Sequence, residues 1–411
     1  MKRIILIVAF FCSVACASAQ KKKAIFIIID GVSKDVLEKV STPNLDAIAK
    51  EGGLLSAYQG GELNEYNQTP TISAPGYDNV LTGVWFNKHN VPDNSIKNPN
   101  YHYPTIFRLF EDQFPKKKTA IFSSWEDNRT KLIGEGLEQT GKILLDHHFD
   151  GLELDTVKYP HDESRKFMSA IDQAVTDDAV RSIRETAPDL SWIYLEFTDD
   201  MGHMYGDSEQ YYDAVKLADR QVGQVWAAIR ERKEKYNEDW LIMVTTDHGR
   251  DLETGKDHGG QSERERAAWI VTNASGLNDY ARESNQVSVV DILPTIARFL
   301  KVKLSSDRQR ELDGVAITGK LSLTKPVATM VDGKINLSWL PAEKEGRVKI
   351  WVSTTNNYKE TGKSDKYSLA GVVPVKDGKF TIELDPNTSS DFYKIVLEGK
   401  YNTVNRWIAA K

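Results

Sequence analysis

Acidic and imidazole side chains occur in this sequence at spacings that suit the binding of divalent metal ions. Asp199 and His203 are four residues apart, Asp247 is followed directly by His248, and His258 lies ten residues after His248. Carboxylate oxygens and imidazole nitrogens, with no thiolate among them, suit Zn²⁺ better than Mn²⁺ or Mg²⁺ when three histidines are present. These residues therefore form a candidate set of metal ligands.

Two further polar residues complete the set. Asp30 directly follows the apolar run 24–29, and Ser73 opens a turn that we expect to enter a short helix. The predicted ligands of a first ion are Asp199, His203 and His258. The predicted ligands of a second ion are Asp30, Asp247, His248 and the oxygen of Ser73. Two such ions, about 4 Å apart, would clamp a phosphorus centre for in-line displacement.

Each of these residues also has a simpler interpretation when it is taken alone. An aspartate after a strand is usually a helix cap, a serine before a helix is more often a cap than a nucleophile, and His203 alone could be a loop histidine. The remaining histidines are expected to be solvated or packed against other side chains, and they are His89, His102, His147, His148 and His161. The metal-site prediction depends on all the ligands falling at strand ends together.

Strands and helices are predicted to alternate along most of the chain. Apolar runs predict strands at 24–29, 119–123, 190–197, 240–245 and 267–272. Other stretches predict helices at 103–110, 177–186, 211–233 and 287–300, and a further helix starting at Thr42-Pro43. This alternation indicates an α/β fold with a doubly wound, mostly parallel sheet. In such a sheet ligands bind beyond the carboxyl ends of the strands, where the candidate ligands fall.

The pattern changes near residue 320. Short alternating segments at 334–339, 348–352, 379–384 and 393–397 are separated by Gly, Pro, Asn and Asp, with no helical stretch between them. Such a pattern predicts a small β-sandwich domain. The predicted division is a signal peptide at 1–19, a catalytic domain at 20–319 and an accessory β-sandwich at 320–411. For the accessory domain we expect a structural role or contact with a glycan or a surface.

The N-terminal segment has the features of a secretory signal peptide. Lys2 and Arg3 precede an apolar run from Ile4 to Ala15, and Ala17-Ser-Ala19 fits a cleavage site. We therefore expect export to the periplasm or the extracellular space. A lipid anchor at Cys16 is the less favoured alternative, because the usual leucine three residues before it is missing. Both cysteines lie in this leader, so the mature chain offers neither disulfides nor thiolate chemistry.

Composition excludes some other classes of protein. Of the 411 residues, 40% are hydrophobic and 27% are charged, which is an ordinary globular composition. The formal net charge of −6 becomes more negative when the two basic leader residues are removed, and no basic patch predicts binding of a nucleic-acid duplex. Outside the leader, no segment is apolar for long enough to form a transmembrane span.

Together these motifs resemble the alkaline phosphatase superfamily and, within it, the type I phosphodiesterase/nucleotide pyrophosphatase branch. The resemblance runs from about residue 24 to about residue 318. The matching motifs are Asp30-Gly31, Thr42–Asp46, Pro70–Pro75, Asp199 to His203, Asp247–Gly249 and His258. The resemblance implies an alkaline phosphatase-like fold, two divalent ions with Zn²⁺ preferred, and a small-molecule phosphate ester as the substrate.

The resemblance also implies a mechanism. It places the nucleophile on Ser73, which would attack phosphorus and form a phosphoseryl intermediate. Asn94 and the N–H of Ala74 would bind the non-bridging oxygens. Serine replaces the threonine that this branch mostly has, Gly76-Tyr77 replaces its usual Asn-His, and Phe86 stands in place of a proline. These departures leave the chemistry intact but weaken any assignment of the substrate.

Three alternative functions remain open. A phosphomonoesterase of the same superfamily would need additional basic groups, for which Arg129, Lys131 and Arg250 are candidates by position only. A sulfatase would need an arginine at the position of Tyr77. A non-enzymatic surface protein would bind glycans through the sandwich and would lack bound metal. No motif identifies the alcohol or nucleoside of the substrate, or the oligomeric state.

The stretch between the motifs is expected to shape the substrate pocket. Residues 95–165 contain no recognisable specificity motif, but they include Trp125 and Tyr159, which are candidates for contact with the substrate.

Overall fold

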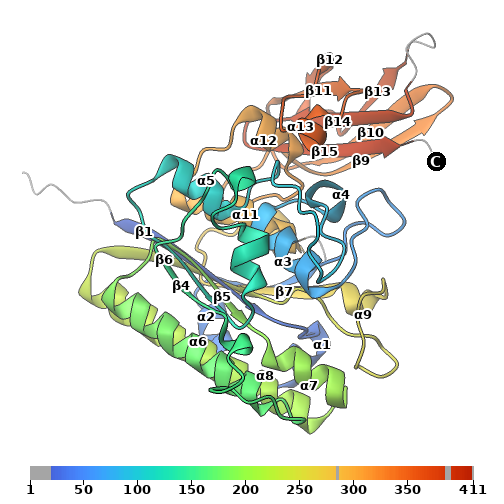
Figure 1. Cartoon of the computed structure of the whole chain (residues 1–411). Coiled ribbons are helices and arrows are strands. Elements are labelled where there is room, and N and C mark those ends of the chain that lie inside the picture. Colours follow the sequence, from blue (N-terminus) through green and yellow to red (C-terminus); the bar gives the residue numbers. More distant parts are fainter. Residues whose placement is uncertain (1–19, 284–286, 385–389, 410–411) are drawn as a thin grey trace, which may run out of the picture.

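The computed structural model describes residues 20–283, 287–384 and 390–409 (Figure 1). The predicted signal peptide at 1–19 lies outside the described residues. None of the helices in this described part is long and apolar enough to cross a membrane.

A mixed eight-stranded sheet forms the centre of the molecule. Its strands are β1 (Lys21–Ile29), β2 (Gly53–Tyr58), β3 (Thr119–Ser123), β4 (His147–Phe149), β5 (Leu190–Leu195), β6 (Glu238–Thr245), β7 (Ala267–Thr272) and β8 (Val287–Ser288). Their order across the sheet is β4-β3-β5-β1-β6-β7-β2-β8. β1 runs parallel to β5 and β6, whereas β7 runs antiparallel to both β6 and β2. The predicted α/β class with a mostly parallel sheet is confirmed.

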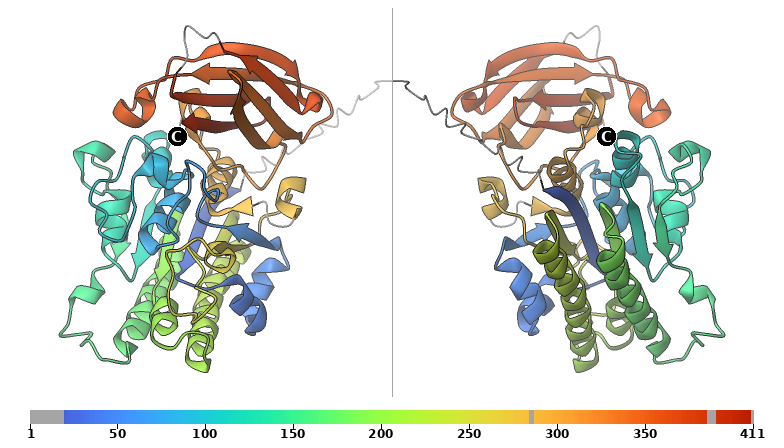
Figure 2. Two further views of the ribbon diagram at one scale, coloured as in Figure 1. Left: turned by 90° about the vertical axis from the view of Figure 1, so that its right-hand side faces the viewer. Right: turned by 90° about the vertical axis from the view of Figure 1, so that its left-hand side faces the viewer.

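Helices cover both faces of this sheet (Figures 1 and 2). The helices are α1 (Lys34–Lys39), α2 (Pro43–Ala49), α3 (Ser73–Thr82), α4 (Phe86–His89), α5 (Ile106–Gln113), α6 (Lys166–Glu185), α7 (Phe197–Tyr205), α8 (Glu209–Lys235), α9 (Glu263–Arg266), α10 (Asp279–Arg282), α11 (Ile292–Leu300) and α12 (Ser306–Glu311). Apolar residues of α3, α5 and α11 share one core with Phe26 and Ile28 of β1. Residues of α2, α6 and α8 share a second core with Ile25 and Ile27. Burial on both faces explains the uninterrupted apolar sequence of β1.

The strand register brings three loops to one edge of the sheet. Ile29 is paired with Leu195 of β5, and Ile28 is paired with Thr245 of β6. Because these parallel strands end at the same level, the residues that follow β1, β5 and β6 leave the sheet side by side. This is the edge at which open α/β sheets bind their ligands.

Several elements differ from the expected boundaries. Of the helix expected at 287–300, the first residues form the strand β8, and α11 begins only at Ile292. The strand expected at 190–197 ends at Leu195, and Asp199 lies in the first turn of α7 rather than in a loop. The helix expected at 177–186 begins at Lys166. β2 was not expected, and it pairs with β7. The segments approach each other closely just before β2, where a Cβ on Gly52 would lie 2.4 Å from the carbonyl oxygen of Thr272.

Two antiparallel sheets make up the C-terminal part of the molecule (Figures 1 and 2). Their strands are β9 (Leu323–Val331), β10 (Lys334–Pro341), β11 (Arg347–Ser353), β12 (Ser368–Pro374), β13 (Lys379–Glu383), β14 (Phe392–Glu398) and β15 (Thr403–Ala409). The orders are β13-β10-β9 and β12-β11-β14-β15, and side chains of both sheets share one core. The expected lack of a helix is wrong, since α13 (Asn357–Thr361) follows β11. The domain division at residue 320 stays a prediction.

Candidate metal centre

The loops after β1 and β6 are joined by hydrogen bonds. The backbone N–H of Gly31 donates to Asp247 Oδ1 over 3.1 Å, and that of Val32 donates to Thr246 Oγ1 over 3.0 Å. Gly31 has a φ of +63°, and a Cβ on it would lie 2.5 Å from Asp199 Oδ1. Glycine is therefore required in the Asp-Gly motif, both for its backbone conformation and for the close approach of Asp199.

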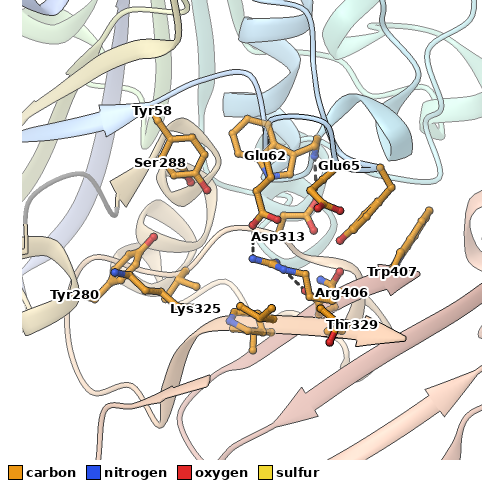
Figure 3. Close-up of a pocket in the computed structure, with 18 residues that line it drawn as sticks. Tyr58, Glu62, Glu65, Tyr280, Ser288, Asp313, Lys325, Thr329, Arg406 and Trp407 are labelled. Carbon is orange, nitrogen blue, oxygen red and sulfur yellow. Dashed lines mark hydrogen bonds and ion pairs between the residues drawn. The ribbon is translucent and has the colours of Figure 1, made fainter. Parts of the chain in front are cut away.

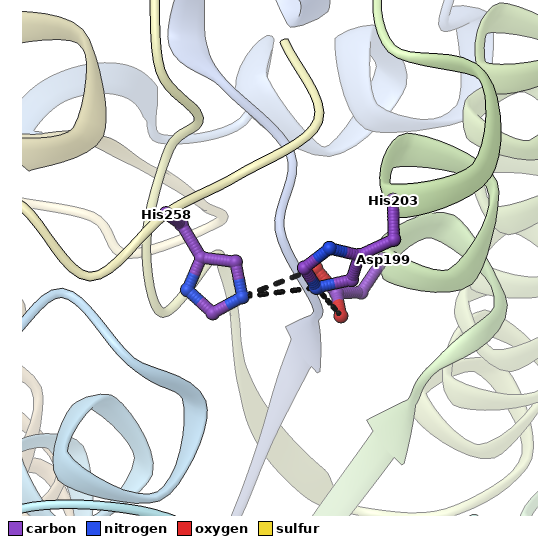
Figure 4. A group of neighbouring side chains, drawn as sticks. All are labelled: Asp199, His203 and His258. Carbon is purple, nitrogen blue, oxygen red and sulfur yellow. Dashed lines mark hydrogen bonds and ion pairs between the residues drawn. The ribbon is translucent and has the colours of Figure 1, made fainter.

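Asp199, His203 and His258 offer ligand atoms that all lie within 4.8 Å of one another (Figure 4). His203 Nε2 lies 3.2 Å from Asp199 Oδ2 and 3.1 Å from His258 Nε2. Asp199 and His203 are one turn apart on α7, so they share a face of the helix. His258 Nδ1 lies 2.9 Å from the carbonyl oxygen of Thr71, which leaves Nε2 available as a metal ligand.

Asp30, Asp199 and His248 form a second such group, so Asp199 belongs to both. His248 Nε2 lies 3.3 Å from Asp30 Oδ1 and 3.3 Å from Asp247 Oδ2, and His248 Nδ1 lies 2.9 Å from the carbonyl oxygen of Gly249. Among the described residues, Asp30 Oδ1, Asp247 Oδ2 and His248 Nε2 are buried without a hydrogen-bond partner. A cluster of orphaned buried oxygen and nitrogen atoms fits a divalent cation.

The electrostatics of the two groups also fit cations. Burial, and then the charge of Asp30, raise the pKa of Asp247 well above its usual range. Burial also raises the pKa of Asp199, but the hydrogen bond with His203 and nearby positive side chains outweigh burial and leave this pKa below its usual range. Burial lowers the pKa of His258 to about 4, which keeps the imidazole neutral. Burial also lowers the pKa of His248, but the charges of Asp247 and Asp30 outweigh burial and raise this pKa to about 9. The crowded carboxylates thus already favour a positive charge at this place, as they would favour a bound cation.

Two buried tyrosines fix the orientation of Asp30. The hydroxyl of Tyr194 donates to Asp30 Oδ2 over 2.6 Å, and the hydroxyl of Tyr77 donates to the same oxygen. Tyr77 is one of the positions that depart from the family motif, and sequence analysis gave it no role. The structure places it behind a predicted ligand, where such hydrogen bonds set the orientation of a carboxylate.

Ser73 and Asn94 meet at the start of α3. Ser73 is the first residue of the helix and is 6% exposed. The backbone N–H of Ala74 donates to Asn94 Oδ1 over 2.9 Å. This differs from the expectation that the Ala74 N–H is open to phosphate, because the side chain of Asn94 already occupies it. The contact orients the Asn94 amide at the mouth of the pocket.

A pocket of about 380 Å³ opens beside the metal-ligand groups. Trp125 lines it, as expected, but Tyr159 belongs to the core beneath α6 and does not line it. The lining residues are Asp30, Ser73, Tyr77, Asn94, Trp125, Glu153, Leu154, His161, Arg165, Phe167, Met168, Tyr194, Glu196 and Asp199. The lining combines aromatic and apolar groups with carboxylates, so it is a mixed pocket, as substrate sites commonly are.

Arg165 is a functional candidate that sequence analysis missed. It precedes α6 with a φ of 56°, a left-handed conformation that is uncommon outside glycine. Its Nη2 lies 2.6 Å from Asp200 Oδ1 and 3.1 Å from Glu196 Oε1, and its guanidinium lies 4.8 Å from the ring centre of Phe167. Its Nε is buried without a partner among the described residues. No motif surrounds it, so only the fold reveals that it lines the pocket.

The three basic residues that were candidates by position are otherwise engaged. Arg250 is fully buried and donates to Asp199 Oδ1 over 2.7 Å, so it supports a predicted ligand from behind. Arg129 is bound by Asp150 over 2.7 Å, among other carboxylates, and Lys131 pairs with Asp127. None of the three lines the pocket.

The remaining histidines have different environments. His89 is buried and lies 2.9 Å from Asn79 Oδ1, and His147 lies 2.6 Å from Asp178 Oδ2, so both are packing residues. His161, in contrast, lines the pocket with its ring stacked on Phe167 at 4.2 Å.

Comparison with known proteins agrees with this geometry. A family model described as type I phosphodiesterase / nucleotide pyrophosphatase matches residues 24–315. Ectonucleotide pyrophosphatase/phosphodiesterase family member 7 of Rattus norvegicus is 24% identical over 241 residues, which are 56% of this chain and 50% of that protein. The Homo sapiens protein of the same name is 23% identical over 244 residues, 57% of this chain and 49% of that protein. The chain thus spans about half the length of these relatives.

Solved structures show the same fold over a larger part of the chain. The structure of BT1596, a 2-O GAG sulfatase, superposes with a TM-score of 0.53 and 12% sequence identity, covering 87% of this chain and 86% of that one. At this level of identity the similarity establishes the architecture and says nothing of the reaction.

Proposed function

We propose that this chain, which belongs to the type I phosphodiesterase/nucleotide pyrophosphatase family, is an exported hydrolase of phosphoric esters that uses two divalent ions and a serine nucleophile. The observation that carries the proposal is the pair of ligand groups that share Asp199, beside a pocket that also holds Ser73. We assign Asp199, His203 and His258 to one ion. We assign Asp30, Asp247 and His248, with Ser73, to the other ion. The oxygen and nitrogen donors favour Zn²⁺.

The chain's own residues suggest the course of the reaction. Ser73 Oγ gives up its proton and forms a bond to phosphorus, the bond from phosphorus to the leaving oxygen breaks, and that oxygen takes up a proton. The oxygen of a water molecule then forms a bond to the phosphorus of the phosphoserine and the bond from phosphorus to Ser73 Oγ breaks. A proton from the water restores the hydroxyl of Ser73, and the phosphate product leaves. The Asn94 amide, held by the N–H of Ala74, donates to a non-bridging oxygen. The two ions, when bound, would supply positive charge that offsets the charge developing on the oxygens around phosphorus.

A phosphodiester or a pyrophosphate ester is the substrate class that the family favours. A phosphomonoesterase is the second candidate, and Arg165 is the observation that favours it. A monoester carries one more negative charge than a diester, and an arginine in the pocket can pair with that additional charge. The two candidates differ in one measurable quantity, the ratio of monoester to diester hydrolysis.

The direct test is a panel of mono-, di- and pyrophosphate esters, including p-nitrophenyl phosphate and bis-p-nitrophenyl phosphate, with and without added Zn²⁺. We expect metal-dependent hydrolysis and a preference for the diester or the pyrophosphate. Failure to hydrolyse any of these esters in the presence of Zn²⁺, Mn²⁺ or Mg²⁺ would remove the proposed function.

Ser73→Ala is expected to retain metal, because the aspartate and histidine ligands remain, and to lose turnover by about four orders of magnitude or more, because the covalent step is lost. Metal content is measured by elemental analysis and turnover by release of p-nitrophenol. Ser95→Ala is the matched control, since Ser95 is an exposed serine whose hydroxyl bonds Asp93 on the surface. Wild-type turnover in Ser73→Ala would refute the assignment of the nucleophile.

A further inference from the structure

The helix that carries Asp199 and His203 begins without a capping side chain of its own. Glu196 stands at the N-cap position of α7, but its side chain makes no hydrogen bond to the first turn. The first N–H groups of a helix have no partner within the helix, and leaving them without an acceptor is costly. Thr198 and Met201, at the start of α7, are buried. The first N–H groups of α7 therefore need acceptors from another part of the chain.

The carboxylate of Asp172 supplies these acceptors. Asp172 lies on α6, 24 residues before Glu196, and is 3% exposed. The N–H of Phe197 donates to Asp172 Oδ2 over 2.9 Å, and the N–H of Glu196 donates to Asp172 Oδ1 over 3.1 Å. The hydroxyl of Ser124 also donates to Asp172 Oδ1. A carboxylate at the start of a helix satisfies the free N–H groups and interacts favourably with the helix dipole.

The first turn of α7 is also tied to the other group of candidate ligands. The hydroxyl of Thr198 donates to the carbonyl oxygen of Asp30 over 2.5 Å, and the N–H of Asp30 donates to the carbonyl oxygen of Leu195 over 3.0 Å. Asp199 follows Thr198 directly and belongs to both groups of ligands. A shift of this turn would therefore move Asp199 away from the ligands that it must meet.

Asp172 also links the metal ligands to the substrate pocket. Met168 lies one turn before Asp172 on α6 and lines the pocket of Ser73, as Phe167 and Glu196 do. The carboxylate thus joins the helix that forms one wall of the pocket to the helix that carries two candidate ligands.

We propose that Asp172 is a positioning residue, which sets the places of Asp199 and His203 by capping α7 from α6. This role rests on the proposed function, because it requires that Asp199, His203 and His258 hold an ion. Asp172 acts through the backbone of Glu196 and not by contact with the ion or the substrate. Its loss should weaken the binding of this ion and leave the binding of the other ion nearly unchanged.

Asp172→Asn in the full chain tests this role. Asparagine has nearly the size of aspartate, but its NH₂ group would face one of the N–H groups that the carboxylate accepts. We expect two bound Zn²⁺, one of them about 10- to 100-fold weaker than in the wild type, in competition titrations with a chromogenic chelator. Turnover of bis-p-nitrophenyl phosphate should fall at low Zn²⁺ and recover as Zn²⁺ is raised. A role in stability alone would not give this recovery.

Asp291→Asn is the matched control, because Asp291 is also a buried carboxylate that accepts two backbone N–H groups. These come from Ser288, over 2.8 Å, and from Val315, over 2.6 Å. Burial raises the pKa of both Asp172 and Asp291 to about 7. Ser288 and Val315 line a pocket beside the C-terminal strands that shares no residue with the pocket of Ser73 (Figure 3). Asp291→Asn should therefore keep the wild-type affinity for both ions.

Ser124→Ala is a milder second variant, which carries the test if Asp172→Asn does not fold. It removes one donor to Asp172 and leaves both N–H contacts in place, so the same ion should bind about two- to tenfold more weakly. Wild-type affinity for both ions in the folded variants would overturn the proposal, as would an equal loss in Asp291→Asn. Failure of the wild-type protein to bind Zn²⁺ would instead remove the proposed function, and the role of Asp172 with it.

Discussion

At the scale of single residues, the predicted ligands converge although they come from distant parts of the sequence. Asp30 and His248 face each other at 3.3 Å, and His203 and His258 face each other at 3.1 Å. The residue types could be identified from sequence because carboxylates and imidazoles are ordinary metal ligands. The residues that hydrogen-bond these ligands could not be identified from sequence. Tyr77, Tyr194 and Arg250 contact the ligands only in the folded chain, and no local spacing in the sequence encodes such contacts.

Tyr77→Phe tests whether the hydroxyl behind Asp30 matters for metal binding. Removing one of the two tyrosine donors to Asp30 Oδ2 loosens the carboxylate, so we expect about 10- to 100-fold weaker affinity for Zn²⁺. The measurement is competition with a chromogenic chelator. Tyr101→Phe is the control, since the hydroxyl of Tyr101 bonds the carbonyl oxygen of Lys131 away from the ligands. Equal Zn²⁺ affinity in the two variants would show that the hydroxyl has no effect on the ion.

Arg165→Ala decides between the two substrate classes. If the guanidinium binds the additional charge of a monoester, kcat/KM for p-nitrophenyl phosphate should fall by about 100-fold or more, while that for the diester changes little. Arg184→Ala is the control, because Arg184 pairs with Glu231 on the surface. An equal fall for both esters would show instead that Arg165 positions Glu196 and Asp200, the two carboxylates that it binds.

At the scale of elements, the strand that precedes each motif was easier to predict than the helix that follows it. β3 and β7 were predicted with their observed bounds, because both are short apolar runs that are buried within the sheet. α7 was missed, since Thr198-Asp199-Asp200 reads as a polar loop and gains its helical form from packing against α8. β2 was missed for a related reason. Its pairing with β7 is a contact between segments far apart in the sequence.

Bound metal is expected to join β1, β6 and α7 into one unit, so chelation should lower the temperature of unfolding. With Zn²⁺ at about 100 times its dissociation constant, the stabilisation is about 2.7 kcal/mol. Calorimetry with and without a chelator measures the shift. In His203→Ala the shift in unfolding temperature caused by the chelator should be much smaller. In His148→Ala, which changes an exposed histidine, the shift should be as large as in the wild type. A chelator that leaves the wild-type midpoint unchanged would contradict a metal centre at these ligands.

At the scale of the whole molecule, buried charges join the C-terminal strands to the α/β part. Lys394 of β14 is fully buried and lies 2.7 Å from both Glu311 of α12 and Asp365. Lys88 of α4 lies 2.5 Å from Asp313 and 3.0 Å from Asn405 of β15. Sequence analysis anticipated a β-rich C-terminal segment but not this junction, because single lysines and glutamates read as surface residues until the fold buries them.

Lys394→Ala should destabilise the protein by about 3–5 kcal/mol, because it leaves two carboxylates buried without their cation. Lys349→Ala, which breaks an exposed pair with Glu398, should cost about 1 kcal/mol or less. Urea unfolding of both variants measures the difference. Similar costs for the two substitutions would mean that the buried network contributes no more than a surface pair.

The position of β1 has a consequence for the synthesis of the protein. β1 is the first strand to leave the ribosome, yet it lies in the middle of the sheet between β5 and β6. β1 can pair with β5 only after residue 195 has been translated, and its other edge can pair with β6 only after residue 245. A nascent chain in this condition is prone to aggregate and to require a chaperone. The proposed set of ligands is complete only after His258 has been translated, so assembly of the whole proposed centre belongs to a late stage of folding of the α/β part.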